Sequence, residues 1–470
     1  MIWNLEKYRD NNALIDEYGT VITYGKLHQE GEKLALAIGK RCLVFILCQN
    51  TIGSVLGYIS CINSKIVPVM LSSHLEKELL ENLLETYHPY YLWVPQNQTE
   101  EFDSAKVVYT SYQYCLLRTH YREYYLLAPE LGLLLTTSGS TGSPKFVRQS
   151  YDNIRANAES IVQYLELKET EKPITTLPMN YTYGLSIINS HLLVGAVLLL
   201  TEKALTQKEF WNFFKEAGAT SFGGVPYTYE MLDRLRFYRM ELPSLRYMTQ
   251  AGGKLIPELH KKFAEYAEKN GKKFIVMYGQ CEATARMGYL PADKAIEKCG
   301  SMGIAIPGGR FRLIGLDGST VTEPYTTGEL VYEGDNVTLG YAECGEDLLK
   351  GDEQHGVLET GDMAQFDEEG FYYIVGRKKR FLKIYGNRVN LDEIDRMVKG
   401  EFLGIDCAAA GVDDHMYIFV TDKSVMNEVR AFVVSKTKLN PAAFIVSEIG
   451  EIPKNDSGKV LYQELEKYYR

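Results

Sequence analysis

The stretch LGLLLTTSGSTGSPKFV, residues 131–147, joins an apolar run to a loop of Thr, Ser and Gly that ends in Pro-Lys. Glycine lets backbone N–H groups come close to phosphate oxygens, the hydroxyls add donors, and Lys145 adds a positive charge. The Walker A spacing, GxxxxGK followed by Ser or Thr, is absent. A Ser/Gly cluster alone favours a surface turn, but the apolar run before it and the Pro-Lys after it favour a phosphate-binding loop.

Upstream of this loop, short apolar runs alternate with amphipathic stretches. Residues 43–48 (LVFILC), 66–71 (IVPVML) and 91–94 have the composition of buried strands, and residues 24–38 have the apolar spacing of a helix. Alternation of strands and helices predicts an α/β fold with largely parallel sheets.

Downstream, the pattern changes twice. From about residue 300 to 341, Gly and Pro separate short alternating runs, which predicts a small antiparallel sheet or barrel. The charged stretch GRKKR, residues 376–380, marks a boundary before a small α+β domain. We therefore expect a large domain over residues 1–378 that includes the small β-barrel, and a mobile C-terminal domain over residues 379–470.

Length, charge and cysteine content argue against several classes of protein. A chain of 470 residues exceeds what one hydrophobic core usually serves. Its net charge of -10 argues against nucleic acid as the main partner. The 8 cysteines include no CxxC pair, which favours a reduced, cytoplasmic location over a zinc site or a disulfide framework. The N-terminal residues do not have the pattern of a signal peptide, and the longest apolar run, residues 192–200, is too short to span a bilayer.

The motif TTSGSTGSPK, residues 136–145, resembles the phosphate loop of the adenylate-forming superfamily, which includes acyl-CoA synthetases, luciferases and peptide-synthetase adenylation domains. Further segments resemble the other motifs of this superfamily in the same order. They are PMNYTYG (178–184), AGGKL (251–255), MYGQCEAT (277–284), GELVYEGDNVTLGY (328–341), TGD (360–362), GRKKRFLKIYGNRVN (376–390) and PKNDSGK (453–459). The resemblance covers nearly the whole chain.

This resemblance implies a set of site residues. The implied catalytic residues are Lys459, Glu282, Thr141 and Lys145, of which Glu282 and Thr141 would also hold Mg²⁺ through oxygen ligands. The implied contacts to ATP or AMP come from Thr137, Ser138, Gly139, Ser140, Gly142, Gly252, Gly253, Tyr278, Gly279, Gln280, Cys281, Asp362 and Arg377. The implied acyl pocket consists of Tyr181, Tyr183, Phe222, Gly223, Gly224, Val225 and Ala251, and the hinge and thiol channel of Lys379, Lys383 and Gly386.

The implied reaction is the activation of a carboxylic acid by ATP to an acyl-adenylate, with release of pyrophosphate, followed by transfer to the thiol of coenzyme A or of a carrier-protein pantetheine. A carboxylic acid has a pKa of about 4 and is already ionised, so no general base is required. The site must instead align the reactants and offset the phosphate charge. In this superfamily the small domain then rotates about the hinge, removing the lysine and opening the thiol channel.

Two residues depart from the superfamily pattern. Phe146 stands where Gly is frequent, and Cys281 stands where Thr usually donates to the α-phosphate. A thiol is a weak donor. Cys281 is therefore the best support for an alternative, a non-catalytic protein that binds a nucleotide or an acyl-adenylate.

A second alternative concerns the substrate. No Asp lies in the segments NYTY (180–183) or FGGVP (222–226), and a buried ammonium without a partner is costly. This favours a fatty, aryl or other acid with an uncharged tail. It leaves an amino acid–carrier protein ligase of the D-alanine type as the alternative, which would need an ammonium partner elsewhere in the pocket.

Overall fold

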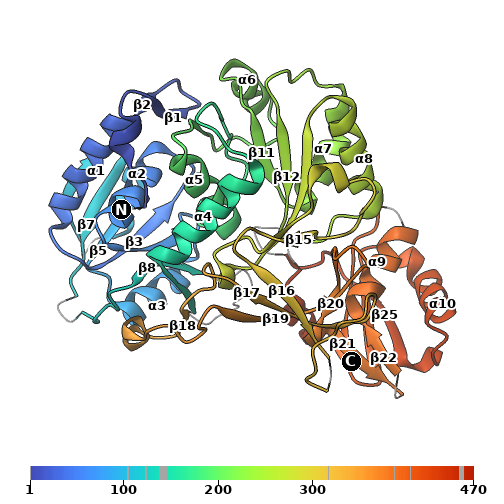
Figure 1. Ribbon diagram of the computed structural model, residues 1–470. Coiled ribbons are helices and arrows are strands. Elements are labelled where there is room, and N and C mark those ends of the chain that lie inside the picture. The colour runs from blue at the N-terminus through green and yellow to red at the C-terminus, as the bar shows by residue number, and fades with distance from the viewer. Residues whose placement is uncertain are drawn as a thin grey trace. The chain divides into compact units, whose positions relative to one another are not determined.

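The computed structural model describes residues 2–102, 105–121, 124–136, 145–315, 317–385, 387–402, 404–454 and 460–469 (Figure 1). The chain packs into two compact units. The first comprises residues 1–299, 303–310 and 332–358, and the second comprises residues 300–302, 311–331 and 359–470.

The first unit contains an eight-stranded sheet of order β18-β9-β8-β4-β3-β5-β7-β6. Its strands are β3 (Leu43–Cys48), β4 (Val67–Ser72), β5 (Tyr91–Pro95), β6 (Lys106–Ser111), β7 (Tyr114–Arg118), β8 (Leu131–Thr136), β9 (Phe146–Ser150) and β18 (Gly340–Ala342). Strands β5, β3, β4 and β8 are parallel, and the strands at either end of this group pair antiparallel. The predicted parallel-rich sheet is confirmed, and β3 has the predicted bounds.

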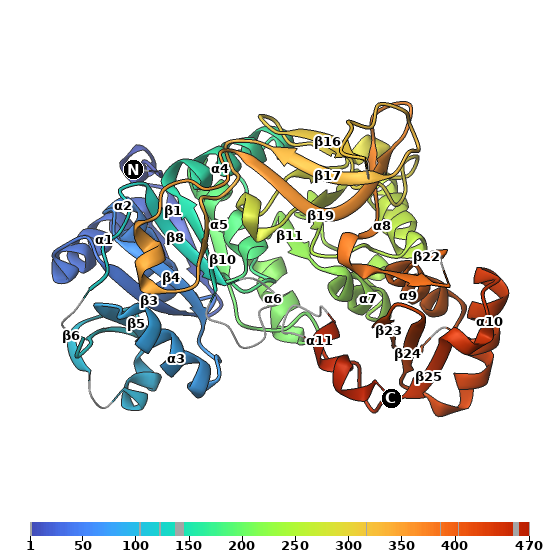
Figure 2. The same ribbon diagram turned by 90° about the horizontal axis from the view of Figure 1, so that it is seen from below.

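Helices cover both faces of this sheet. They are α1 (Tyr24–Ile38), α2 (Ile52–Asn63), α3 (Lys77–Tyr87), α4 (Tyr151–Leu165) and α5 (Thr182–Leu193). Helices α1 and α2 lie on one side of β3, and α3 lies on the other (Figure 2). On β3, Val44 and Ile46 belong to a core shared with α1 and α2, whereas Phe45 and Leu47 belong to a core shared with α3. Burial on both faces explains why the strand reads as one continuous apolar run. Helix α1 has the predicted bounds.

A five-stranded sheet of order β11-β12-β13-β14-β15 also belongs to the first unit. Its strands are β11 (Ser221–Gly224), β12 (Tyr247–Gln250), β13 (Lys273–Tyr278), β14 (Gly288–Tyr289) and β15 (Ile304–Ala305), and the helices between them are α7 (Pro226–Arg234) and α8 (Pro257–Lys269). Strands β11, β12 and β13 are parallel. Two of the sequence motifs, AGGKL (251–255) and MYGQCEAT (277–284), therefore lie at the carboxyl ends of the adjacent strands β12 and β13, where ligands bind in open α/β sheets, and the segment FGGVP (222–226) lies at the end of β11.

The remaining elements of the first unit lie around the apolar run of residues 192–200. A three-stranded sheet of order β10-β1-β2 consists of β1 (Asn12–Asp16), β2 (Val21–Thr23) and β10 (Leu198–Leu200), and α6 spans Lys208–Glu216. The apolar run comprises the end of α5, a turn and β10. No helix in the described ranges is long and apolar enough to cross a membrane.

The second unit begins with a four-stranded sheet of order β16-β17-β19-β20, in the region where the sequence predicts a small barrel. Its strands are β16 (Arg310–Ile314), β17 (Gly328–Glu333), β19 (Val357–Phe366) and β20 (Tyr372–Arg377). Strands β19 and β20 are antiparallel, with Asp362 opposite Arg377.

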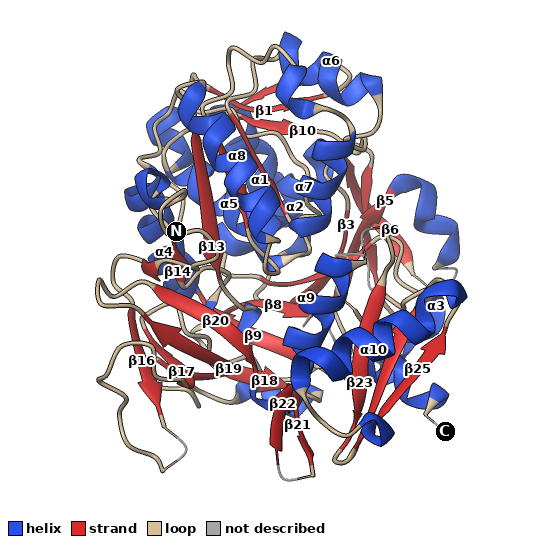
Figure 3. Cartoon of the chain, turned by 90° about the vertical axis from the view of Figure 1, so that its right-hand side faces the viewer, coloured by secondary structure: helices blue, strands red, loops and turns tan. Residues whose placement is uncertain are grey.

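The C-terminal part of the second unit is α+β, as predicted. It contains the hairpin β21 (Phe381–Ile384) and β22 (Asn387–Asn390), the sheet β23 (Cys407–Val412), β24 (His415–Val420) and β25 (Phe444–Glu448), and the helices α9 (Leu391–Glu401), α10 (Met426–Thr437) and α11 (Tyr462–Leu465) (Figure 3). Ile394 of α9, Ile418 of β24 and Val433 of α10 share one core. The predicted domain boundary at 378/379 falls within the second unit and stays a prediction.

Candidate active site

The predicted phosphate loop connects two antiparallel strands. Strand β8 ends at Thr136, which pairs with Phe146 at the start of β9. Residues 137–144 lie outside the described residues, and with them the predicted roles of Thr137, Ser138, Gly139, Ser140, Thr141 and Gly142. Lys145 is the first described residue after this segment.

The departure at Phe146 has a structural reason. Its side chain is fully buried, and its ring lies 4.7 Å from the ring of Tyr87 and 6.4 Å from that of Phe45, measured between centroids. Phe146 therefore belongs to the core between the sheet and α3. A glycine here would remove this packing.

Lys145, Tyr341 and Glu282 form a cluster next to the predicted loop. The Lys145 Nζ lies 3.5 Å from the centroid of the Tyr341 ring, a cation–π contact, and 3.5 Å from Oε1 of Glu343. The hydroxyl of Tyr341 donates a 2.7 Å hydrogen bond to Oε1 of Glu282. Burial and the neighbouring Glu282 charge raise the pKa of Tyr341, so the hydroxyl stays protonated and can donate. Two predicted catalytic residues thus contact the same tyrosine.

Strand β18 carries Tyr341 and is fixed by a buried arginine. Arg148 of β9 is fully buried, and its guanidinium donates to the carbonyl oxygens of Tyr341 and Leu339, each at 3.0 Å. It also forms an ion pair with Glu353. Arg148 therefore links β18, which carries Tyr341, to β9, which follows the predicted loop in sequence.

The turn after β13 presents Glu282. An added Cβ at Gly279 would overlap the carbonyl of Ala285, so the turn needs glycine there. Thr284 and Ala285 have φ values of 51° and 94°, in the left-handed region. The Cys281 thiol lies 3.9 Å from the carbonyl oxygen of Thr136, the last residue before the predicted loop. The residue that departs from the superfamily pattern thus lies beside Thr136, at the end of β8.

Tyr278 and the adjacent glycines lie at the ends of β13 and β12. The amide of Gln280 donates to the Tyr278 hydroxyl at 3.3 Å. Gly252 has a φ of 83°, and an added Cβ there would lie 2.8 Å from the hydroxyl oxygen of Tyr181 and 3.0 Å from Val225. The carbonyl of Gly253 accepts a hydrogen bond from the Gln250 side chain. The AGGKL loop therefore runs directly past two residues of the predicted acyl pocket.

Tyr183 lies against the end of β11. Its hydroxyl forms a 2.7 Å hydrogen bond with Oγ1 of Thr249, and an added Cβ on Gly223 would lie 2.9 Å from its oxygen. Burial raises the pKa of Tyr183 to about 12. The peptide N–H of Ala251 donates to the carbonyl of Gly224, which brings these two strand ends together.

Phe222 lies on the other face of β11. Its ring packs against those of Phe214, Phe237 and Tyr229, and an added Cβ on Gly224 would also meet Tyr229. Successive residues of a strand point to opposite faces. Of the predicted acyl-pocket residues on β11, only Gly223 faces Tyr183.

The predicted ribose-binding pair is part of the second unit. Asp362 is buried, and its Oδ1 lies 3.3 Å from Nε of Arg377, whose side chain is 62% exposed. The Arg377 peptide N–H donates to Asp392 at the start of α9. An anchored carboxylate beside an exposed guanidinium offers both acceptors and donors to a sugar.

The hinge segment is only partly described. Lys379 lies in the short 3₁₀ helix Lys378–Arg380, and Lys383 is exposed on β21. Gly386 and Lys459 lie outside the described residues. Val460, directly after Lys459, pairs with Lys454.

A buried ionic cluster follows the hinge. Arg380 donates to Asp392, to Oδ2 of Asp395 at 2.8 Å and to the Ala409 carbonyl at 2.9 Å. Its guanidinium lies 3.5 Å from the ring centroid of Tyr462, whose hydroxyl also donates to Asp395. Burial raises the pKa of Asp395 to about 6. This cluster joins the hinge, α9, β23 and α11.

A family model described as "AMP-binding enzyme" matches residues 2–342. The chain belongs to the AMP-binding enzyme family. A probable CoA ligase from Humulus lupulus is 28% identical over 348 residues, covering 70% of this chain and 65% of that ligase. A 2-succinylbenzoate–CoA ligase from Bacillus pumilus is 29% identical over 338 residues, covering 70% of this chain and 67% of that ligase. The matched part thus spans less than two thirds of the first of these relatives.

Two solved structures with bound ATP share the fold. The o-succinylbenzoate coenzyme A synthetase from Bacillus subtilis, in complex with ATP and magnesium, has a TM-score of 0.79 at 22% identity, covering 98% of each chain. MatB from Rhodopseudomonas palustris with ATP has a TM-score of 0.79 at 19% identity, covering 99% of this chain and 97% of that one. The predicted fold class is confirmed.

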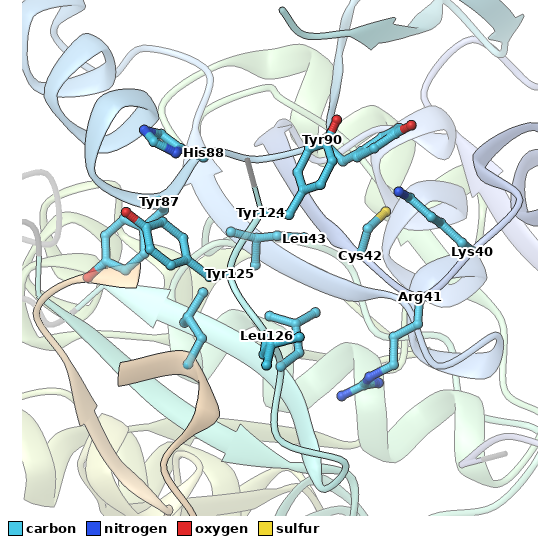
Figure 4. Close-up of a pocket in the computed structure, with 12 residues that line it drawn as sticks. Lys40, Arg41, Cys42, Leu43, Tyr87, His88, Tyr90, Tyr124, Tyr125 and Leu126 are labelled. Carbon is cyan, nitrogen blue, oxygen red and sulfur yellow. The ribbon is translucent and has the colours of Figure 1, made fainter. Parts of the chain in front are cut away.

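The lining of one cavity of this AMP-binding chain includes none of the predicted site residues that the structure describes (Figure 4). Its volume is about 170 Å³, and its lining includes Lys40, His88, Tyr90 and Tyr124. The Lys40 Nζ lies 3.7 Å from the ring centroid of Tyr90 and 4.7 Å from that of Tyr124. The chain's own lysine thus occupies the aromatic surface, and this cavity is not the active-site candidate.

Proposed function

We propose that this chain uses ATP to convert a carboxylic acid into its acyl-adenylate and then transfers the acyl group to a thiol. The observation that carries the proposal is the cluster in which Tyr341 hydrogen bonds to Glu282 and contacts Lys145, the last residue of the predicted phosphate loop. A carboxylate and a lysine at this place are suited to a metal–phosphate complex. The names of the similar ligases support the same reaction class.

In the first step, a carboxylate oxygen of the acid attacks the α-phosphorus of ATP. The new O–P bond forms while the bond to the bridging oxygen breaks, and pyrophosphate leaves. Lys145 and Lys459 supply positive charge, and Tyr278, Asp362 and Arg377 hold the adenosine. Glu282 fits Mg²⁺ because it is an oxygen ligand whose Oε1 is oriented by Tyr341, and bound Mg²⁺ would offset charge on the phosphates.

In the second step, the thiol sulfur attacks the acyl carbonyl carbon. The S–C bond forms, the C–O bond to AMP breaks, and the thiol proton passes to solvent. No oxidant or reductant is needed. We further propose that residues 379–470 move as one domain about Lys379 between the steps, removing Lys459 and bringing Lys383 and Gly386 to the thiol channel.

Coenzyme A is the proposed thiol because the relatives are named as CoA ligases. Carrier-protein pantetheine is the alternative, loosely supported by a similar structure of a peptide-synthetase adenylation–carrier pair with phenylalanyl-adenylate. A cytoplasmic location is part of the same proposal, because the eight cysteines are free thiols.

ATP–pyrophosphate exchange tests the proposal. We would measure it with Mg²⁺ across straight-chain, aryl, dicarboxylic and amino acids. Exchange that depends on one acid class supports adenylation, and exchange that depends on D-alanine or another amino acid supports the carrier-ligase alternative. Confirmed ATP binding without exchange for any acid would favour the non-catalytic alternative.

The Tyr341–Glu282 hydrogen bond predicts a change in magnesium dependence. In Tyr341→Phe the ring contact with Lys145 remains, but Glu282 loses the donor that orients it. We expect the Mg²⁺ concentration for half-maximal exchange to rise about 5- to 10-fold, equivalent to about 1–1.5 kcal/mol for one hydrogen bond. Tyr58→Phe removes a buried hydroxyl that bonds Asn189 and serves as the control. An unchanged Mg²⁺ dependence in Tyr341→Phe would mean that the bond does not orient a metal ligand.

Replacing the Cys281 thiol with a hydroxyl is expected to increase the rate of ATP–pyrophosphate exchange. Cys281→Thr places a stronger donor beside the end of β8, near Thr136. We expect exchange to become about 3- to 10-fold faster, equivalent to about 0.7–1.4 kcal/mol. Cys344→Thr changes a partly buried thiol in another segment and should leave the rate unchanged. A slower Cys281→Thr enzyme would show that this thiol suits the site better than a hydroxyl.

A further inference from the structure

Arg286 is a buried cation whose described partners are all neutral. The residue is only 2% exposed. Its Nε donates to Oγ of Ser186 at 3.1 Å, and its Nη1 donates to the Tyr164 hydroxyl at 2.9 Å and approaches Sδ of Met277 at 3.4 Å. Among the residues that the structure describes, no Asp or Glu forms an ion pair with Arg286, and none accepts a hydrogen bond from its Nη2.

The other two arginines that the structure describes as buried have carboxylate partners. Arg148 pairs with Glu353, and Arg380 pairs with both Asp392 and Asp395. Removing a charge from water is costly, and hydroxyl and thioether groups offset only part of that cost. A guanidinium binds a carboxylate through two parallel N–H donors, so Arg286 is suited to an anion that enters from outside the chain.

Arg286 lies next to a residue of the predicted acyl pocket. Its guanidinium carbon lies 5.3 Å from the ring centroid of Tyr183, the pocket residue that faces Gly223. It is four residues after Glu282, so one turn carries both the candidate metal ligand and the cation. Ala285, directly before Arg286, has a φ of 94°, and such backbone strain clusters at ligand-binding sites.

Among the described residues around Arg286, none of the titratable side chains acts as its counter-ion. His191 hydrogen bonds to the Tyr247 hydroxyl at 2.8 Å, and burial lowers its pKa to about 3, so it is neutral. Burial raises the pKa values of Tyr164 and Tyr183, so neither phenol is an anion at neutral pH. Of Arg286, His191, Tyr164 and Tyr183, only Arg286 is therefore charged at neutral pH.

We propose that Arg286 binds a second carboxylate on the substrate, and that the chain activates a dicarboxylic acid. One carboxylate reacts with ATP while the other pairs with the guanidinium across the pocket. This inference rests on the proposed function and changes the expected substrate from an uncharged-tail acid to one with an anionic tail. A cation at this position also disfavours an amino-acid ammonium.

Matched pairs of acids test the inference. We would measure kcat/KM for exchange with straight-chain monocarboxylates and with dicarboxylates of equal length from four to eight carbons, and with benzoate against its carboxylated analogues. The wild-type chain should prefer the dicarboxylate of the best pair by about 10- to 100-fold, as expected for a charge-assisted contact. A preference for the monocarboxylate in every pair would overturn the inference.

Variants separate substrate binding from packing. Arg286→Met fills similar volume without charge, and it should raise KM for the dicarboxylate about 10- to 100-fold while leaving the paired monocarboxylate unchanged or improved. Tyr164→Phe, the control, removes one acceptor but keeps the cation, so the preference should persist. Equal losses for both acids in Arg286→Met would show a packing role only. If that variant does not fold, Arg286→Lys should keep the dicarboxylate preference with a raised KM, and loss of the preference there would overturn the inference.

Failure of the proposed function would be recognised separately. If no acid supports exchange by the wild-type chain, adenylation fails as the function, and thermal stabilisation then tests the site. Stabilisation by dicarboxylates over monocarboxylates in the wild type, lost in Arg286→Met, would still support the anion site. Equal stabilisation by both acids, or none, would overturn it.

Discussion

Replacing Lys459 with alanine is expected to slow acyl-adenylate formation by about 100- to 1,000-fold, the usual cost of removing a group that stabilises transition-state charge. This lysine is proposed to bridge the acid carboxylate and the α-phosphate, where negative charges approach each other. ATP affinity should change little, because Lys145 and the adenosine contacts remain. The measurement is single-turnover formation of acyl-AMP, with ATP binding followed separately by calorimetry.

The second half-reaction supplies the internal control for Lys459. If the lysine leaves the site before thiol transfer, Lys459→Ala should convert supplied acyl-AMP and coenzyme A to thioester at nearly the wild-type rate. Lys467→Ala removes an exposed cation from the same terminal segment and should affect neither step. Wild-type adenylation rates in Lys459→Ala would disprove the assigned role.

Replacing Arg380 with alanine is expected to destabilise the C-terminal part of the second unit by about 3–5 kcal/mol, because it leaves a buried carboxylate without its cation. Arg380 contacts Asp392, Asp395 and the Tyr462 ring at once. A chain of two units is not expected to unfold in one step, so the measurement is hydrogen exchange in α9 and β23. Arg396→Ala, an exposed arginine of α9 that bonds backbone carbonyls, is the control.

The same variant predicts a pH dependence. Burial already raises the pKa of Asp395 to about 6, and the Arg380 charge opposes that rise, so its removal raises the folded-state pKa further. A carboxylate with a raised folded-state pKa is destabilising when ionised, and stability is lost as pH rises through that pKa. The loss of stability caused by Arg380→Ala should therefore be larger at pH 7.5 than at pH 5. A deficit that grows towards pH 5 would contradict this explanation.

The elements with the strongest local patterns were predictable from sequence. Residues 24–38 have apolar residues at helical spacing, and residues 43–48 are apolar throughout because β3 is buried on both faces. The resemblance of the motifs also predicted the fold, and two of them, AGGKL and MYGQCEAT, lie at the ends of the adjacent parallel strands β12 and β13. These features depend on residues that are close together in the sequence, so one sequence is enough to predict them.

Side-chain partners that are distant in sequence were not predictable. Tyr341 is the last residue of a recognised motif, but only the structure shows that it contacts Glu282 and Lys145. The sequence of the turn ending in Arg286 shows a charge but not its burial or its neutral partners. The sequence favours an uncharged-tail acid because neither pocket segment contains an acidic partner for an ammonium. The buried group without an ion pair among the described residues is instead a cation, Arg286.

Isotope transfer tests the central claim most directly. The chain is incubated with ATP, Mg²⁺, coenzyme A and an acid labelled with oxygen-18 in its carboxyl groups, and the nucleotide product is analysed by mass spectrometry. Attack of the carboxylate on the α-phosphorus predicts AMP that carries one oxygen-18 atom. Formation of ADP with oxygen-18 in inorganic phosphate would place the attack at the γ-phosphorus and contradict the acyl-adenylate mechanism.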